Sequence, residues 1–173
     1  NIPNLVFLAP SSPEEYLAML DWAIEQDKHP VMIRQPVGGF ATSPYAVRKD
    51  YGDLNKAEVM QKGEKVALIG VGQFADLVMK AAEILKQSGI NATVINPLYV
   101  SGLDTDLLTS LKANHQIIAT LEDGTIEGGF GHKVASFYGK DNLKVLNFGL
   151  EKLFHDRYNP MELAKENHLT PEL

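Results

Sequence analysis

Residues 117–132 read IIATLEDGTIEGGFGH and contain the strongest sequence signal for the fold class. The apolar run Ile117–Leu121 predicts a strand that ends on the acidic pair Glu122–Asp123. The glycines that follow predict a tight turn, and a helix is expected to begin near His132. A strand, a glycine-rich loop and a helix in this order predict the carboxyl edge of a parallel sheet, where α/β proteins bind ligands or partner subunits. A plain tight turn, in which glycine supplies positive φ angles, is the alternative.

Strands and helices alternate around this stretch from Val66 to the carboxyl end. The expected strands are Val66–Val71, Ala92–Asn96, Ile117–Leu121 and Lys144–Asn147, and the expected helices are Phe74–Ser88, Asp104–Asn114, His132–Tyr138 and Pro160–Asn167. Such alternation predicts a mostly parallel sheet with helices on both faces. We therefore expect a three-layer α/β/α domain over residues 66–173.

The preceding residues carry less structure. A strand at Leu5–Ala9, a helix introduced by a Ser-Ser-Pro cap and a strand at Pro30–Arg34 make one β-α-β unit. A unit of this size is too small to bury both faces of a sheet. We interpret residues 1–40 as the last β-α-β of a domain whose earlier part lies outside the chain. Residues 41–65 are turn-rich and are expected to form a linker with one short strand near Ala57–Met60.

The composition excludes several classes of protein. The chain has 173 residues and a net charge of −6, which argues against a nucleic-acid-binding surface. No apolar run is long enough to cross a bilayer, and the first residues do not resemble a signal peptide. The absence of cysteine excludes disulfides, thiolate metal sites and cysteine nucleophiles. We expect a cytoplasmic protein without membrane or nucleic-acid partners.

Residues 70–75 read GVGQFA and match G-x-G-x-x-A, the alanine form of the dinucleotide-binding fingerprint, between a strand and a helix. The fingerprint also requires an acidic residue at the end of the second strand to bind the ribose. Here that strand ends in Asn96 and Pro97. A tight turn between strand and helix is therefore favoured over nucleotide binding.

Arg34 is the candidate substrate-binding residue. It ends a strand just before Pro36, and its planar guanidinium could bind phosphate or carboxylate. An ion pair across the domain boundary is the alternative. The histidines show no metal-ligand spacing, so no metal site is expected. His132 is a weak candidate for acid/base chemistry, and a surface or capping role is favoured. Glu122 could contact another subunit, anchor the loop or simply end the strand in solvent.

Three groups of motifs occur in an order that a known family shares. They are NIPNLVFLAP with SSPEE at 1–15, HPVMIRQPVG at 29–38, and the segments 63–72, 91–104 and 120–131. The first two resemble the last helix and the "IRYPRG" strand of a pyrimidine-binding domain, and the third group resembles successive strands and loops of a transketolase C-terminal domain. Essentially the whole chain thus resembles the 1-deoxy-D-xylulose-5-phosphate synthase family of the transketolase superfamily.

The resemblance implies an intact enzyme that uses thiamine diphosphate and Mg²⁺. It would join pyruvate to glyceraldehyde 3-phosphate with loss of CO₂, giving 1-deoxyxylulose 5-phosphate for isoprenoid biosynthesis. This chain would supply acceptor-side contacts through Arg34 and contacts of a homodimer, and would be inactive without the remainder of the protein. The family's GDG motif for the diphosphate and Mg²⁺ is absent. Glu122–Gly124 resembles it only superficially and lies in the wrong domain. No catalytic, cofactor-binding or metal-binding residue is therefore expected in this chain.

Two departures from the family concern the acceptor phosphate. The family's "YPRG" reads QPVG here, with Val37 in place of arginine, and another family arginine falls at Leu98. In the family, that second arginine and the one matching Arg34 help to hold the phosphate, so only Arg34 remains. Two other functions fit the layout. One is a different transketolase-like enzyme, such as a transketolase or a 2-oxo-acid dehydrogenase β chain, and the other is a non-catalytic interaction module.

Overall fold

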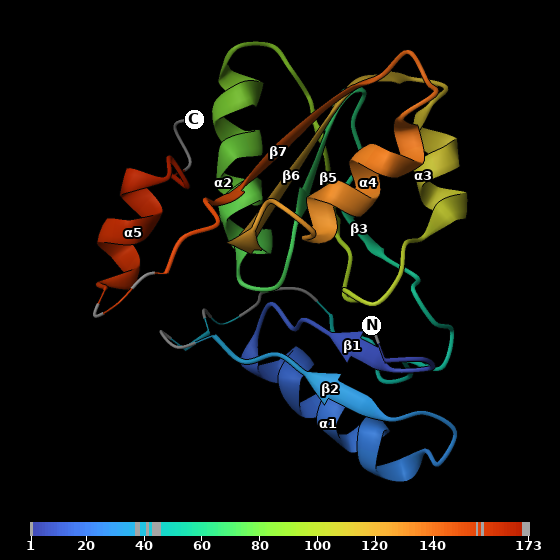
Figure 1. The fold of residues 1–173 in the computed structure, drawn as a ribbon. Coiled ribbons are helices and arrows are strands. Elements are labelled where there is room, and N and C mark those ends of the chain that lie inside the picture. Colours follow the sequence, from blue (N-terminus) through green and yellow to red (C-terminus); the bar gives the residue numbers. More distant parts are fainter. Residues whose placement is uncertain are drawn as a thin grey trace.

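Two sheets of unequal size organise the chain (Figure 1). The computed structural model describes residues 2–36, 39, 40, 42, 46–154, 156 and 158–170. The smaller, amino-terminal part contains β1 (Val6–Leu8), α1 (Pro13–Glu25) and β2 (Val31–Ile33). The larger, carboxyl-terminal part contains β3 (Glu58–Gln61), β4 (Lys65–Gly70), α2 (Phe74–Gln87), β5 (Thr93–Asn96), α3 (Thr105–Leu111), β6 (His115–Thr125), α4 (Phe130–Tyr138), β7 (Lys144–Leu150) and α5 (Pro160–Glu166).

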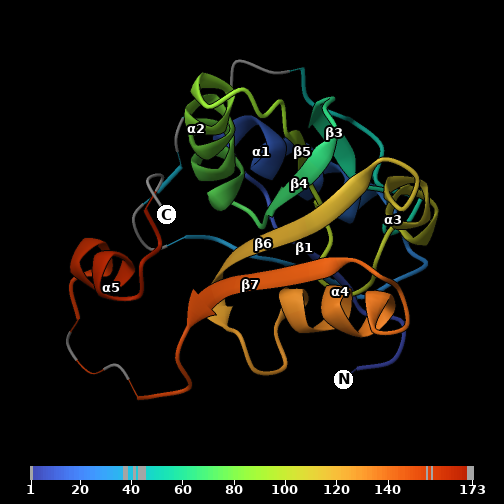
Figure 2. The same ribbon diagram turned by 90° about the horizontal axis from the view of Figure 1, so that it is seen from above.

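The larger sheet has the order β3-β5-β4-β6-β7. Strands β4, β5, β6 and β7 are parallel, and β3 pairs antiparallel with β5 at one edge. Helices α3 and α4 pack on one face and α2 on the other (Figure 2). The predicted mostly parallel, three-layer α/β/α fold is confirmed. The part of the chain that the structure describes has no helix long and apolar enough to span a membrane.

The observed strands extend two of the sequence predictions. The short strand expected near Ala57–Met60 is β3, so the sheet begins inside the predicted linker. The division into residues 1–40, 41–65 and 66–173 as folding units stays a prediction. Strand β6 does not end at the acidic pair, because it passes an irregularity and pairs again with β7 where Thr125 lies opposite Leu150.

The amino-terminal part is joined to the larger part through the segment that follows β5. The Ala9 N–H donates to the carbonyl of Leu98 (2.8 Å), and the Val100 N–H donates to that of Phe7 (2.8 Å). Leu98 is fully buried, and it shares a core with Met19 and other residues of the amino-terminal part. A β-α-β unit too small for its own core therefore completes one with a segment of the larger part.

A buried polar network strengthens the same junction. The Glu15 carboxylate on α1 accepts hydrogen bonds from the Ser11 N–H (2.7 Å) and from the Asn96 side chain at the end of β5 (3.1 Å). Glu15 and Asn96 are 6 % and 1 % exposed. Buried carboxylates require such partners, because an unsatisfied one would lose its hydration without compensation. The contact fixes α1 relative to the larger sheet.

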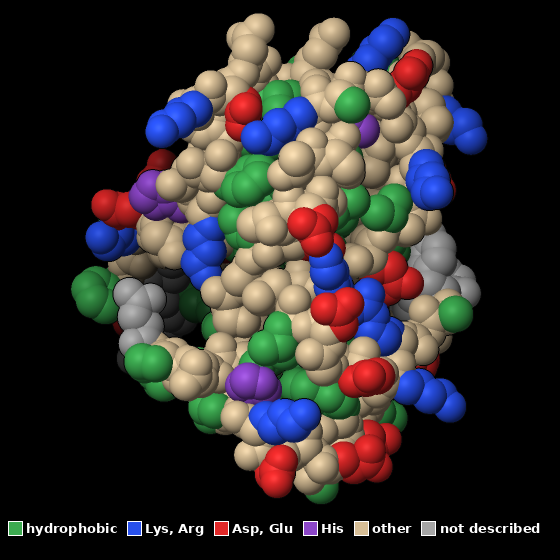
Figure 3. All heavy atoms as spheres, turned by 90° about the vertical axis from the view of Figure 1, so that its right-hand side faces the viewer, with side chains coloured by type: hydrophobic (Ala, Val, Ile, Leu, Met, Phe, Trp, Pro, Cys, Tyr) green, Lys and Arg blue, Asp and Glu red, His purple; other side chains and the backbone are tan. Residues whose placement is uncertain are grey.

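The outer surface beside α3 carries both signs of charge. Acidic and basic side chains are interspersed on this face of the molecule (Figure 3). Lys56 is an example, since its ammonium lies 2.7 Å from Asp106 and 3.5 Å from Asp104. Exposed pairs of this kind contribute little to stability.

Candidate functional site

The carboxyl edge of the larger sheet faces the amino-terminal part (Figure 1). A shallow cavity, itself only large enough for about one water molecule, lies between them, and its walls come from both parts of the chain. It is lined by Pro10, Arg34, Pro36, Val71, Gly72, Gln73 and Asp123. The sequence predicted that ligand-facing groups would collect at this edge, and the structure brings Arg34 together with the loops after β4 and β6.

Arg34 forms an ion pair with Asp123. Its backbone N–H donates to the Leu8 carbonyl (2.9 Å), which fixes the residue just beyond β2. One guanidinium nitrogen contacts an oxygen of the Asp123 carboxylate, and the two side chains are 30 % and 25 % exposed. The other carboxylate oxygen accepts a long hydrogen bond from the Gln73 side chain (3.4 Å). The ion pair across the boundary, which was the alternative for Arg34, is present, and its role in substrate binding stays a prediction.

A larger cavity of about 440 Å³ adjoins the first and shares Gln73 and Asp123 with it. It lies between the beginning of α2 and helix α5. Its other lining residues are Gly39, Phe74, Asp76, Leu77, Leu150, Tyr158, Pro160, Met161, Leu163, Ala164 and Leu169. Cavities of this size accommodate small molecules. Asp123 therefore lies in the wall of a space large enough for a substrate, and its partner Arg34 lines the adjoining shallow cavity.

The G-x-G-x-x-A segment forms a tight turn. A Cβ atom on Gly70 would lie 2.4 Å from the Phe74 carbonyl oxygen, so the close approach of strand and helix requires glycine. Gly72 has a φ of +58°. The N–H groups of Phe74 and Ala75 donate to carbonyls of the turn itself, at 3.2 and 3.0 Å. These amides are therefore not free to bind a pyrophosphate, which supports the interpretation as a plain turn.

Glu122 anchors the glycine-rich loop. Its carboxylate accepts hydrogen bonds from the N–H groups of Phe130 (2.9 Å) and Gly131 (2.8 Å) at the start of α4, and the residue is 4 % exposed. A Cβ atom on Gly129 would lie 2.5 Å from that carboxylate, so the anchor also requires glycine. The negative charge suits the amino end of a helix. Of the predicted roles, the loop anchor is confirmed and the solvated strand end is wrong.

His132 is exposed and lies in the first turn of α4. Its Nδ1 atom accepts a hydrogen bond from the Gly128 N–H (3.2 Å), so the imidazole closes the same loop that Glu122 anchors. This supports the capping role over acid/base chemistry. Among the described residues, no group of three or more His, Asp or Glu side chains is placed to hold a metal ion.

The two positions at which the family's arginines are replaced lie in different surroundings. Leu98 is buried in the core of the amino-terminal part and does not line either cavity. Its φ of 60° is rare for a residue with a side chain. The Asn96 side chain accepts a hydrogen bond from its backbone N–H at 3.2 Å. Val37 lies outside the described residues.

Burial perturbs two ionisable groups near this junction. Burial raises the pKa of Tyr99 to about 12, and the Arg48 guanidinium opposes that shift. Burial also raises the pKa of Glu58, with a smaller contribution from the charge of Glu15. Glu58 lies opposite Asn96 in the pairing of β3 with β5. Both groups belong to the structural junction and line neither cavity.

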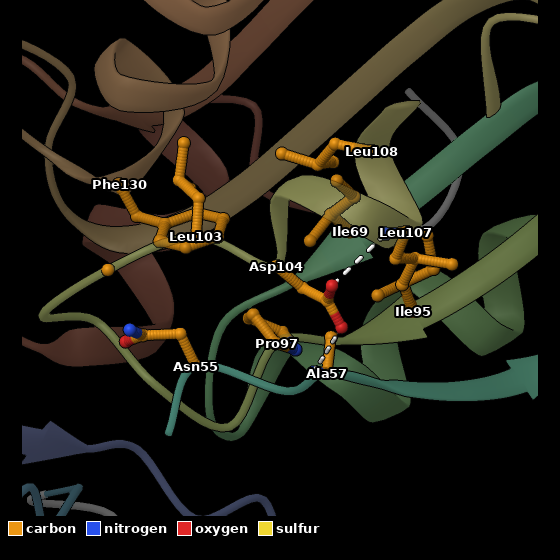
Figure 4. Close-up of a pocket in the computed structure, with 11 residues that line it drawn as sticks. Asn55, Ala57, Ile69, Ile95, Pro97, Leu103, Asp104, Leu107, Leu108 and Phe130 are labelled. Carbon is orange, nitrogen blue, oxygen red and sulfur yellow. Dashed lines mark hydrogen bonds between the residues drawn. The ribbon is translucent and has the colours of Figure 1, made fainter. Parts of the chain in front are cut away.

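A further hollow beside α3 is only large enough for about one water molecule (Figure 4). Apolar side chains form most of its walls. The Asp104 carboxylate reaches it but accepts hydrogen bonds from the N–H groups of Leu107 (3.0 Å) and Ala57 (3.1 Å). Its polar group is therefore committed to capping α3 and holding the chain before β3, and this hollow is structural.

Sequence reasoning did not foresee the contact that Asp123 makes. Sequence reasoning gave candidate roles to Glu122 alone, whereas the two side chains face different parts of the molecule and each has a partner. Glu122 turns inward to α4, and Asp123 turns to Arg34. The alternation of side chains along a continuing strand would have given this difference, had β6 been predicted to extend beyond Leu121.

The fold and the site define the class of protein. Residues 55–172 match the family model described as "Transketolase, C-terminal domain", and the chain belongs to this family. Among solved structures, a chain described as "Split gene transketolase, inactive beta4 tetramer" has a TM-score of 0.83 at 23% identity, with 99% of this chain and 55% of that chain covered. At this level of identity the likeness shows a shared fold.

The curated relatives are more specific. The chain is 35% identical over 175 residues to the 1-deoxy-D-xylulose-5-phosphate synthase of Symbiobacterium thermophilum, covering 99% of this chain and 26% of that protein. It is 34% identical to the probable 1-deoxy-D-xylulose-5-phosphate synthase 2, chloroplastic, of Oryza sativa subsp. japonica, covering 98% of this chain and 25% of that protein. The resemblance found in the motifs is confirmed. The chain spans about a quarter of the length of these relatives.

Proposed function

We propose that this chain is the carboxyl-terminal part of a thiamine-diphosphate-dependent transferase. As in the reaction after which its relatives are named, the whole protein would transfer a two-carbon unit from pyruvate, with loss of CO₂, to an aldehyde such as glyceraldehyde 3-phosphate. The similarity to those relatives along the whole chain is the observation that carries the proposal. The protein would act as a cytoplasmic homodimer and supply product for isoprenoid biosynthesis.

The role proposed for this chain is to bind the acceptor. Arg34 stands at the carboxyl edge of the sheet, beside a cavity of about 440 Å³, and its guanidinium is partly exposed. A guanidinium held at one end by an ion pair retains further N–H donors for oxygen atoms of a substrate. Arg34 would thus orient the acceptor, while pairing with Asp123 fixes the guanidinium in the wall of the adjoining shallow cavity.

The described residues of this chain do not fit thiamine diphosphate or Mg²⁺. The carboxylates near this edge are committed elsewhere, since Glu122 accepts from two backbone amides and Asp123 pairs with Arg34. The backbone N–H groups of the turn before α2 likewise donate to carbonyls of the turn itself. We therefore assign the cofactor and Mg²⁺ to the remainder of the protein. The chain by itself would be inactive.

The experiment is to compare the full-length protein with this chain, each supplied with thiamine diphosphate and Mg²⁺. The full-length protein should release CO₂ from pyruvate and join the remaining carbons to an aldehyde, and the chain should do neither. Transfer from a ketose phosphate without use of pyruvate would instead identify a transketolase. Absence of both reactions in a protein that binds the cofactor would contradict the proposal.

Arg34→Ala in the full-length protein tests the role of the arginine. Loss of a charge-assisted contact should lower kcat/KM for the acceptor by about tenfold to a hundredfold. Arg34→Lys should restore little, because an ammonium lacks the planar fork. Release of CO₂ from pyruvate in the absence of acceptor serves as the control. An equal loss in that half-reaction, together with a lower Tm, would show that Arg34 is only a structural ion-pair residue.

A further inference from the structure

The described residues that line the two adjoining cavities at the carboxyl edge carry little positive charge. Among the described residues that line them, Arg34 is the only cation, whereas Asp123 and Asp76 are carboxylates. Asp76 is held by Lys80 at 2.7 Å on the outer side of α2. Asp123 is therefore the carboxylate that bears directly on a ligand beside Arg34.

Asp123 also faces the amino end of α2. One of its oxygens contacts the Arg34 guanidinium, and the other accepts from Gln73, the residue that precedes the helix. A phosphate placed here would have to displace the Asp123 carboxylate from Arg34 and then remain beside its negative charge. Like charges at such short range disfavour binding of the doubly charged form.

The same groups suit hydroxyl oxygens. The guanidinium and the Gln73 amide are donors, and the Asp123 carboxylate and the Gln73 carbonyl are acceptors. A hydroxyl group both donates and accepts, so it can use the pair without breaking it. The burial of Leu98 in the amino-terminal core leaves that position unable to add a contact in these cavities.

We infer that Asp123 is a specificity-determining residue, which makes this site favour an uncharged, hydroxyl-bearing aldehyde over its phosphate ester. The inference rests on the proposed function for the identity of the site as the acceptor site, and it narrows the class of acceptor. Asp123 acts on the ligand by occupying the Arg34 guanidinium, which a phosphate bound beside it would need.

The first test measures binding of inorganic phosphate to the full-length protein, saturated with thiamine diphosphate and Mg²⁺, by calorimetry. Asp123→Asn should tighten phosphate binding by about tenfold, the effect of gaining one charge-assisted contact. Asp123→Asn combined with Arg34→Ala should lose that gain, because the contact needs the guanidinium. Asp76→Asn removes the same charge from the same cavity wall without touching Arg34, and should change the affinity less than twofold.

Two results of this test would overturn the inference. One is unchanged phosphate affinity in Asp123→Asn. The other is a gain that persists when Arg34 is also replaced, or that Asp76→Asn reproduces, because general charge and not the pair would then control binding.

The second test compares glyceraldehyde with glyceraldehyde 3-phosphate as acceptors. The unsubstituted protein should use glyceraldehyde at least as well, and Asp123→Asn should shift the ratio of the two kcat/KM values about tenfold toward the phosphate ester. A ratio within one variant is insensitive to loss of folded protein. Product from both acceptors with an unshifted ratio would overturn the inference and leave the proposed function standing. If neither acceptor gives product but Asp123→Asn still binds phosphate more tightly, the proposed transferase function is refuted. The effect of Asp123 on phosphate binding is then supported.

Discussion

The two parts of this chain form their hydrophobic cores in different ways. The carboxyl-terminal sheet has helices on both faces and a separate cluster of buried side chains under each layer. The amino-terminal β-α-β unit has a single cluster, and two of its buried members, Leu98 and Tyr99, come from the other part. Of the buried residues in the clusters of the larger part, Ala9 comes from the amino-terminal unit, whereas the smaller part shares its single cluster with Leu98 and Tyr99. Interactions across the junction, including the pair Arg34–Asp123, join the two parts, and the proposed acceptor site lies at the same junction.

The strongest test of this dependence truncates one fully buried residue in each core. Ile118→Ala in β6 and Met19→Ala in α1 should each cost about 2–5 kcal/mol in local stability. Ile118→Ala should speed hydrogen exchange in both parts, because the amino-terminal core cannot persist without the segment after β5. Met19→Ala should speed exchange only in β1, α1 and β2. Equal acceleration in β4 and β6 by Met19→Ala would mean that the two parts unfold as one unit.

A smaller effect is expected from two matched tyrosines. The Tyr99 hydroxyl donates to the Tyr51 carbonyl across the amino-terminal core, and the Tyr138 hydroxyl donates to the Leu108 carbonyl inside the larger part, both at 2.7 Å. Replacing either by Phe should cost about 0.5–1.5 kcal/mol. Thermal unfolding followed by hydrogen exchange should locate the loss from Tyr99→Phe in the amino-terminal part and that from Tyr138→Phe in α3 and α4. Coincident patterns would contradict the separation of the two cores.

The smallest effect concerns the pH dependence of the junction. Burial, aided by Glu15, raises the pKa of Glu58 in the folded protein above its ordinary value of 4.5. The folded state then binds the proton more tightly than the unfolded state, so stability falls as pH rises from about 4.5 through the raised pKa. Glu58→Gln should flatten this fall and raise the Tm at neutral pH. Glu64→Gln, at an exposed position beside β4, is the control. A Tm difference that does not depend on pH would exclude titration of Glu58 as the cause.

Local patterns predicted the elements of the larger part but placed some of their ends incorrectly. The alternation of apolar segments and capping residues was sufficient for the helices, and the Asp104 side chain caps α3. Strand β6 is longer than predicted because its last residues are held by β7, which lies more than twenty residues later in the sequence. Such pairing has no signature in a glycine-rich segment read alone.

The candidate site was predicted in part. Arg34 was identified from its place at the end of a strand, and both alternatives for it, a ligand contact and an ion pair, were stated. The partner Asp123 lies 89 positions later in the sequence, and local spacing contains no information on which distant carboxylate will meet a given arginine. The same limit applies to the Glu15–Asn96 contact.

The fold class, the family and the tight turns could be predicted from the sequence alone, because they follow from periodicity, glycine placement and motifs that are local in the chain. The folded structure was needed to show which of two adjacent carboxylates anchors a helix and which one neutralises Arg34. It was also needed to show that Leu98 is a core residue and that the smaller part completes its core with residues of the larger part. These outcomes depend on long-range packing, in which the twist and length of β6 aim neighbouring side chains at different partners.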